Sequence, residues 1–164
     1  MKSRRVISIV GMAVVGVFAI SITGASAATH GVCVLSGTAN FSPGLKATAS
    51  PLSYTFTGSF GNCQGVSGIT SGSVSASGSG SLGCANGSSS GTAIVNWSNG
   101  TASTIPFTTT SAAAVTEVKG TVSSGTFAGL AAKAVIAFTT SSPQLCATTG
   151  LPSAAFKGPA EIGT

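Results

Sequence analysis

Charged side chains are the scarcest component of this 164-residue sequence. It contains seven lysines and arginines, two glutamates, one histidine and no aspartate. The formal net charge is +5, but Lys2, Arg4 and Arg5 stand together at the N-terminus. The rest of the chain has four lysines against two glutamates, a net charge of +2. Because it has neither a basic stripe nor a cationic amphipathic helix, we expect no nucleic-acid partner and no membrane partner.

The side chains that most enzymes use are almost missing as well. The only carboxylates are Glu117 and Glu161, and the alternation around them predicts that both are exposed. The only imidazole is that of His30. A serine hydroxyl needs a base positioned beside it to act as a nucleophile, so the many serines alone do not indicate an active site. We therefore predict a protein that is not an enzyme and that uses no cofactor and no metal. The remote alternative is a hydrolase that uses the two glutamates.

The first residues have the three parts of a secretory signal peptide. The basic residues precede a mostly apolar run over 6–22, and Ala25-Ser26-Ala27 supplies small residues in the A-x-A arrangement. We predict a signal peptide over 1–27, with cleavage after Ala27. The remaining chain, 28–164, is long enough for one domain with its own core. We expect this domain to be secreted, either free or associated with the cell wall.

Cysteine is rare but informative in this sequence. An even number of cysteines in an exported chain indicates disulfides. The sequence has no C-x-x-C pair, which would have indicated a metal site instead. Three pairings are open to Cys33, Cys63, Cys84 and Cys146. We favour Cys33–Cys63 with Cys84–Cys146, because strands that follow one another are usually close in space.

The sequence is rich in apolar side chains that alternate with hydroxyl side chains, with glycine between the runs. Leu52, Tyr54 and Phe56, for example, alternate with serine and threonine. Turn residues follow at short intervals and no helical periodicity stands out, which predicts eight to ten short strands. We predict an all-β, antiparallel β-sandwich, with a small β-barrel as the alternative. The order Cys84…Trp97…Cys146 makes the sandwich immunoglobulin-like in architecture.

The clearest local structure is a hairpin over 92–106 around Asn99-Gly100. Both residues tolerate the positive φ that a two-residue type I′ turn requires, and this turn pairs Trp97 with Ala102. One face of the hairpin then consists of Val95, Trp97, Ala102 and Thr104, and the other of Ile94, Asn96, Ser103 and Ile105. We predict that the Trp97 face lies in the core.

Serine occupies every second position from 71 to 81. In an extended strand these hydroxyls all project from one face. Gly78 and Gly80 lie on the opposite face, where we expect them to bend or divide the strand. Two asparagines of the hairpin extend the polar surface. The candidate binding surface, here called the serine surface, consists of Ser71, Ser73, Ser75, Ser77, Ser79, Ser81, Asn96 and Asn99.

Four short motifs are typical of strands and turns: SGTANFSPGL at 36–45, YTFTG at 54–58, WSNGT at 97–101 and GTF at 125–127. With these motifs the chain resembles small exported proteins of actinomycetes that carry no assigned function. The resemblance covers nearly the whole chain. It implies a β-rich fold and brings no catalytic residues.

The scarcity of charge also bears on function, because charged residues normally protect the edges of a sheet. A partner protein can add a strand to an open edge. We therefore expect an exported, non-enzymatic domain that acts through protein–protein contact, at the cell envelope or within an exported assembly. The alternative is a module that binds glycan or cell wall, through the serine surface or by stacking on Trp97.

Overall fold

The computed structural model describes residues 31–163, most of which lie in β-strands. The strands are β1 (Gly31–Leu45), β2 (Ser50–Gln64), β3 (Gly72–Leu82), β4 (Asn86–Trp97), β5 (Ala102–Ala112), β6 (Val115–Thr121), β7 (Ser124–Gly125), β8 (Ala131–Thr139) and β9 (Leu151–Ile162), with a short 3-10 helix, η1 (Pro143–Ala147), before β9. None of the helical structure in 31–163 is long and apolar enough to cross a membrane. The predicted signal peptide lies outside the described residues.

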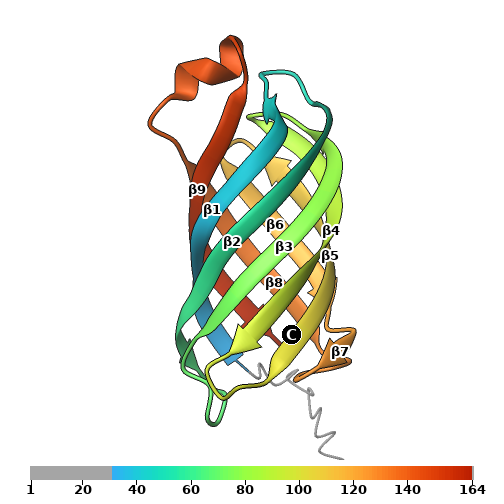
Figure 1. Cartoon of the computed structure of the whole chain (residues 1–164), viewed down its shortest axis with the longest axis vertical. Helices are drawn as coiled ribbons and strands as arrows, with labels where there is room; N and C mark the ends of the chain where they lie inside the picture. The colour runs from blue at the N-terminus through green and yellow to red at the C-terminus, as the bar shows by residue number, and fades with distance from the viewer. Residues whose placement is uncertain (1–30, 164) are drawn as a thin grey trace, which may run out of the picture.

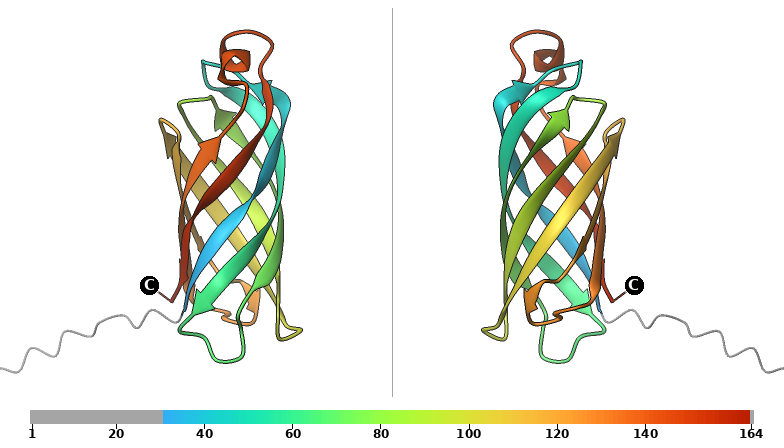
Figure 2. Two further views of the ribbon diagram at one scale, coloured as in Figure 1. Left: turned by 90° about the vertical axis from the view of Figure 1, so that its left-hand side faces the viewer. Right: turned by 90° about the vertical axis from the view of Figure 1, so that its right-hand side faces the viewer.

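The eight long strands close into one antiparallel barrel (Figure 1). Their order is β4-β3-β2-β1-β9-β8-β6-β5, and β5 pairs in turn with β4. The strands run obliquely around the barrel axis (Figure 2), as the closure of a sheet requires. β7 adds only a two-residue pairing to β5. The all-β prediction is confirmed. Of the two architectures predicted, the structure has the small β-barrel, which was the alternative to the sandwich.

The predicted sandwich is wrong because the first and last strands pair. β1 and β9 are in register from Gly31 opposite Ile162 to Asn40 opposite Ser153, so the sheet does not divide into two layers. The immunoglobulin-like core fails for a related reason. Trp97 ends β4, whereas Cys84 precedes the start of this 12-residue strand. Such a strand spans roughly 35 to 40 Å, so the tryptophan and this disulfide lie at opposite ends of the barrel.

Alternation along the strands divides their side chains between the interior and the exterior. On β2, Leu52 and Tyr54 are buried, whereas Ser53 is exposed. The inward positions of β3 include Gly78, where an added Cβ would lie 2.5 Å from the hydroxyl of Tyr54. Gly78 thus makes room for the tyrosine ring. β3 continues unbroken from Gly72 to Leu82, so the predicted bend or division does not occur.

The hairpin of β4 and β5 forms, but its register differs by one residue from the predicted one. The Gly100 amide donates to the Trp97 carbonyl (3.0 Å) and the Trp97 amide donates to the Thr101 carbonyl (2.8 Å), which makes a three-residue loop. In this loop only Gly100 has a positive φ, 82°, as in a type I turn followed by a bulge. A one-residue shift exchanges the two faces of a strand, so Ser103 points inward and Ala102 outward.

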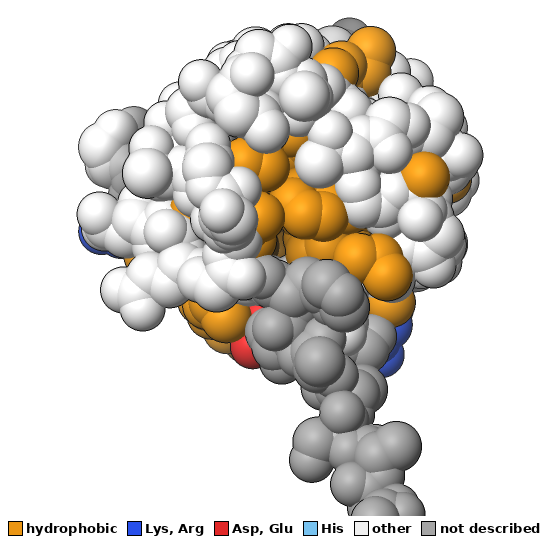
Figure 3. Space-filling view, turned by 90° about the horizontal axis from the view of Figure 1, so that it is seen from below, with side chains coloured by type: hydrophobic (Ala, Val, Ile, Leu, Met, Phe, Trp, Pro, Cys, Tyr) orange, Lys and Arg blue, Asp and Glu red, His pale blue; other side chains and the backbone are white. Residues whose placement is uncertain are grey.

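Trp97 nevertheless lies in the core, as predicted, with 4% of its surface exposed. Its indole Nε1 donates to Ser103 Oγ at 2.8 Å, and the Ser103 hydroxyl donates to the Thr126 carbonyl. The rings of Phe60 and Phe127 have their centroids 5.4 and 5.5 Å from that of Trp97. Seen from this end, hydrophobic side chains occupy the middle of the barrel (Figure 3). Aromatic packing therefore fills this half of the interior, the Trp97 end.

The register of the hairpin makes Ser103→Ala a destabilising substitution. The change leaves the Trp97 indole N–H and the Thr126 carbonyl without their partner, so we expect the free energy of unfolding to fall by about 1–3 kcal/mol. Thr104→Ala, on the outward side of the same strand, is the control and is expected to stay within about 0.5 kcal/mol. Urea denaturation measures both. A neutral Ser103→Ala variant would support the type I′ register instead.

Both disulfides that the sequence favours are present. Cys33–Cys63 joins β1 to β2, and Cys84–Cys146 joins the turn between β3 and β4 to η1. The second bridge connects segments 62 residues apart in the sequence. It therefore holds the η1 segment against the end of the barrel opposite the Trp97 end, which we call the η1 end.

Candidate functional site

The serine surface lies on the outside of the barrel. Its six serines are exposed on the outer face of β3 or, for Ser71, directly before it. Asn96 is the register partner of Ser73, so β4 continues the surface. Asn99 lies apart in the turn, where its Oδ1 accepts hydrogen bonds from the amide (3.1 Å) and the hydroxyl (2.8 Å) of Thr101. The structure thus gives Asn99 a role in the turn.

The two glutamates are on the outer face as well. Glu117 on β6 forms an ion pair with Lys119, with 2.9 Å between Oε1 and Nζ. Glu161 on β9 is the register partner of Lys133 on β8. β8 separates the two carboxylates, and each has a lysine as its neighbour. This arrangement does not place the two glutamates around a common site.

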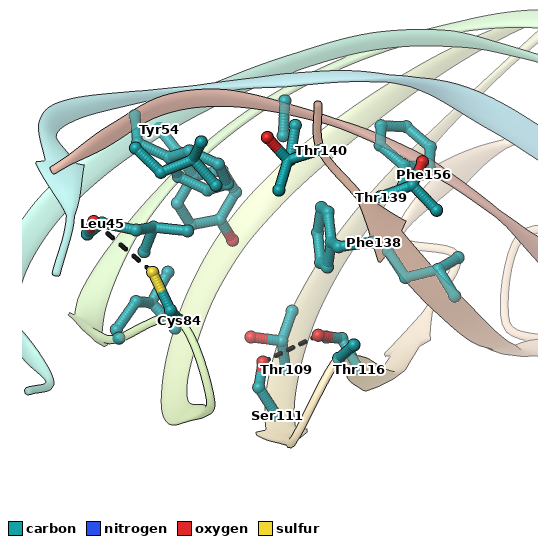
Figure 4. A pocket seen from close by; sticks show the side chains of 18 of the residues that line it. Leu45, Tyr54, Cys84, Thr109, Ser111, Thr116, Phe138, Thr139, Thr140 and Phe156 are labelled. Carbon is teal, nitrogen blue, oxygen red and sulfur yellow. Dashed lines mark hydrogen bonds between the residues drawn. The ribbon is translucent and has the colours of Figure 1, made fainter. Parts of the chain in front are cut away.

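The interior at the η1 end is a cavity of about 360 Å³ (Figure 4). All eight long strands contribute to its lining, together with the loops at this end of the barrel. Among the described residues that line it, none carries a formal charge and most are apolar. None of these residues belongs to the binding surface predicted from the sequence, and Cys84 and Cys146 were predicted only as a disulfide pair.

Small side chains explain why this half of the barrel is hollow. Protein interiors are normally packed as densely as organic crystals, so a run of small inward residues leaves space unless larger neighbours fill it. Toward the η1 end the inward positions of β3 and β4 are mostly small, namely Ala76, Gly78, Gly80, Gly87, Ser89 and Gly91, with Leu82 as the one large side chain among them. Toward the Trp97 end they include Val74, Ala93, Val95 and Trp97. The sequence contained this signal, but Gly78 and Gly80 were expected to bend or divide the strand.

One wall of the cavity is aromatic. It consists of Phe41 on β1, Phe56 on β2, Phe138 on β8 and Phe156 on β9, and we call it the aromatic wall. The centroid of Phe156 lies 5.5 Å from that of Phe56 and 6.0 Å from that of Phe138, and both pairs are edge-to-face. Edge-to-face packing is a favoured geometry for aromatic pairs, so these rings support one another and leave apolar surface toward the cavity.

The wall on β4, β5 and β6 carries hydroxyl groups. Tyr54 reaches over Gly78 and shares a hydrogen bond of 2.9 Å with Ser89, which shares another of 2.6 Å with Thr109. A second pair, Ser111 and Thr116, is joined by a hydrogen bond of 2.7 Å (Figure 4). We call the set Tyr54, Ser89, Thr109, Ser111 and Thr116 the hydroxyl wall. Because β4 and β5 lie opposite β9 and β1 in the closed order of strands, Ser89, Thr109 and Ser111 face the aromatic wall. Tyr54 comes from β2 and borders the aromatic wall, with its ring centroid 6.5 Å from that of Phe41.

Burial fixes the protonation state of the one titratable residue in the cavity. Desolvation raises the pKa of Tyr54 above its usual value of 10.0, and the hydrogen bond with Ser89 offsets part of this rise. The phenol is therefore protonated at neutral pH and able to donate a hydrogen bond. The hydroxyl wall is thus polar but uncharged.

Comparison with known protein families, curated proteins and solved structures gave no match. The geometry of the barrel is therefore the observation from which its function has to be inferred. The cavity combines two features of a binding site, a concave and largely apolar volume and a small number of grouped polar atoms.

The mouth of the cavity lies at the η1 end and is lined by Gly83, Cys84, Ala113, Ala114, Thr140, Pro143 and Cys146. The Cys84–Cys146 bridge crosses this region. The loop between β1 and β2 supports both cysteines, because the Cys84 amide donates to the Lys46 carbonyl and the Ala47 amide donates to the Cys146 carbonyl, each at 2.8 Å. The disulfide thus ties two sides of the mouth together.

Proposed function

We propose that this protein is a non-enzymatic binding protein that holds one small, largely apolar molecule inside its barrel. The observation that carries the proposal is the uneven filling of the interior. Trp97, Phe60 and Phe127 fill the Trp97 end, whereas about 360 Å³ stays open at the η1 end, between the aromatic wall and the hydroxyl wall. This volume lies within the usual range of ligand sites, about 300–1,000 Å³. An eight-stranded barrel is wide enough to hold one small ligand.

The proposal includes export from the cell. Disulfides persist mainly in oxidising compartments, and the chain has two of them. The features of residues 1–27 support the same conclusion, because they have the pattern of a cleaved signal peptide. An exported barrel with an apolar cavity and a hydroxyl-rich outer surface suits the capture or transport of a poorly soluble molecule outside the cell.

The closed barrel changes how much support the functions expected from the sequence receive. Strand addition by a partner protein needs an open edge, and each of the eight long strands is paired on both sides. Protein–protein contact stays a prediction, but the open sheet edge on which it was based is not present among the eight long strands. Glycan binding by the serine surface also stays a prediction, although Trp97 is buried and offers no ring for stacking. The cavity supports the binding of a small molecule more directly than the outer surface supports protein–protein contact or glycan binding.

Filling the cavity tests the proposal. Ala154 is buried and lines the cavity, whereas its neighbour Ala155 is exposed on the outside of β9. The uncharged dye N-phenylnaphthylamine, which fluoresces in apolar surroundings, is expected to bind the unmodified protein saturably. Because the new ring occupies the ligand volume, Ala154→Phe is expected to weaken binding by about tenfold or more. Ala155→Phe, the matched control, is expected to leave the affinity unchanged.

A second measurement covers the case in which Ala154→Phe does not fold. A ligand that binds only the folded state stabilises it, by about 2.7 kcal/mol at a concentration 100 times the Kd. The dye is therefore expected to raise the Tm of the unmodified protein. Equal dye binding by all three proteins, or no binding and no rise in Tm, would overturn the proposed function.

A further inference from the structure

The hydroxyl wall has hydrogen-bonding capacity that its own contacts do not use. Tyr54, Ser89 and Thr109 have three hydroxyl protons, and the structure shows two hydrogen bonds among them. Ser111 and Thr116 have two protons and one hydrogen bond. Each network therefore has one donor left over, and its oxygens have free lone pairs. Both networks line the cavity, so these groups are available to a molecule inside it.

The two networks are close enough to form one polar region. Thr109 and Ser111 are two residues apart on β5, so both point inward and lie about 7 Å apart along the strand. Ser89 is the register partner of Thr109 on one side, and Thr116 is that of Ser111 on the other. One hydroxyl, carbonyl or ether group of a ligand can reach this region while the rest of the molecule lies elsewhere.

The remainder of the cavity suits an apolar body. The aromatic wall faces the hydroxyl wall, and aliphatic side chains such as Leu35 and Ile136 complete the lining. A ring or short hydrocarbon placed there loses contact with water without burying a polar group. The two walls together therefore match a molecule with one polar end and one apolar end.

Charge is the property that the cavity does not accommodate. No lysine or glutamate of residues 31–163 lines it, and the ion pair of Glu117 with Lys119 lies on the outer face. An ionised carboxylate or ammonium moved into this space would lose its hydration without gaining a partner of opposite charge, which is strongly unfavourable. The hydroxyl wall compensates a neutral polar group far better than an ion.

We infer that the ligand of this cavity is an uncharged amphipathic molecule, such as an aromatic or terpenoid alcohol or ketone, whose oxygen bonds to the hydroxyl wall and whose hydrocarbon part packs on the aromatic wall. The inference rests on the proposed function and adds the chemical class of the ligand. It excludes fatty acids and other organic anions as ligands at neutral pH.

A matched series of probes tests this inference. Naphthol, naphthalene and naphthoate share one ring system and differ only in the polar group. We expect naphthol to bind about tenfold more tightly than naphthalene, since it gains one or two hydrogen bonds of ordinary strength. Naphthoate is expected to bind about tenfold more weakly than naphthalene, or not at all. Isothermal titration calorimetry at neutral pH measures all three affinities.

Substitutions locate the polar contact. Tyr54→Phe/Ser89→Ala/Thr109→Val removes the first network, and Ser111→Ala/Thr116→Val removes the second. Removing all hydroxyls of a network leaves no partner unpaired, so the fold is expected to tolerate each variant. At least one of them is expected to lower the tenfold preference for naphthol over naphthalene to about twofold or less. The control is Thr108→Val/Thr110→Val, which removes exposed hydroxyls from the outer face of β5 and is expected to keep the preference.

The outcomes separate this inference from the proposed function. The preference is a ratio of two affinities for the same protein, so partial unfolding of a variant does not change it. Equal binding of naphthol and naphthalene, binding of naphthoate as tight as that of naphthol, or a full preference in both network variants would overturn the ligand class and leave the proposed function standing. Failure of naphthalene, naphthol and the dye to bind would overturn both.

Discussion

Replacing Trp97 with alanine is expected to lower the free energy of unfolding by about 3–5 kcal/mol. The Trp97 ring is 4% exposed and packs against Phe60 and Phe127, with centroid distances of 5.4 and 5.5 Å. Its removal leaves a void at the filled end of the barrel. It also leaves the buried Ser103 hydroxyl without its 2.8 Å donor. Chemical denaturation, followed by circular dichroism, measures the change.

Two controls define what this loss means. Ile94 lies on the same strand but is 49% exposed, so Ile94→Ala is expected to change the free energy of unfolding by no more than about 0.5 kcal/mol. If Trp97→Ala is as mild as Ile94→Ala, the ring does not hold the Trp97 end together. The folded fraction of Trp97→Ala is expected to bind N-phenylnaphthylamine with unchanged affinity, because the cavity occupies the other half of the interior.

Removing the Cys84–Cys146 bridge is expected to affect both stability and ligand exchange. Because the cysteines are 62 residues apart, the chain-entropy estimate predicts that Cys84→Ser/Cys146→Ser lowers the free energy of unfolding by about 4 kcal/mol. The bridge also ties two sides of the mouth together. Once η1 is released, we expect the dye to dissociate about tenfold faster, which stopped-flow fluorescence measures.

The other disulfide is the matched control. Cys33 and Cys63 are 30 residues apart, so Cys33→Ser/Cys63→Ser is expected to lower the free energy of unfolding by a similar amount, about 3.5 kcal/mol. Cys33 lies near Trp97, away from the mouth, so its loss is expected to leave dye dissociation unchanged. Equal effects of the two pairs on dissociation would show that η1 does not restrict the mouth.

Local alternation was enough to predict most of the strands and the side chains they expose, except on the β5 side of the hairpin, where Ser103 and Ile105 were assigned to the wrong face. The serines of β3 all face outward, as a period of two requires, and Trp97 is buried. The expectation that successive strands are neighbours accounts for Cys33–Cys63, which joins β1 to β2. Cys84–Cys146 was also predicted, but it joins segments that are not successive strands, 62 residues apart in the sequence. The other predictions depend on residues close together in the sequence, and for this reason the sequence supports them.

The closure of the barrel depends on a pairing that local pattern does not encode. β1 and β9 stand at opposite ends of the described chain, and their alternation would suit a sandwich equally well. The hairpin register depends on whether Asn99-Gly100 forms a two-residue or a three-residue loop, and the same two residues suit both. A difference of one residue was enough to assign Ser103 to the wrong face.

The cavity was missed because its polar groups come from strands far apart in the sequence. Tyr54 and Ser89 are separated by 35 residues, and Ser89 and Thr109 by 20. Each of them alone is an ordinary side chain in an alternating strand. The informative pattern was the set of small residues on the inward side of β3 and β4. It becomes a cavity only when the closed order of strands places β3 and β4 across the barrel from β8 and β9.

The most direct test of the account is a crystal structure of the protein with bromonaphthol, in which anomalous scattering locates the bromine. The account predicts one strong bromine site inside the barrel at the η1 end, with the ring against Phe138 and Phe156 and the naphthol oxygen within hydrogen-bonding distance of the hydroxyl wall. Bromine found only on the outer surface at saturating bromonaphthol, or a cavity without the ligand, would contradict it.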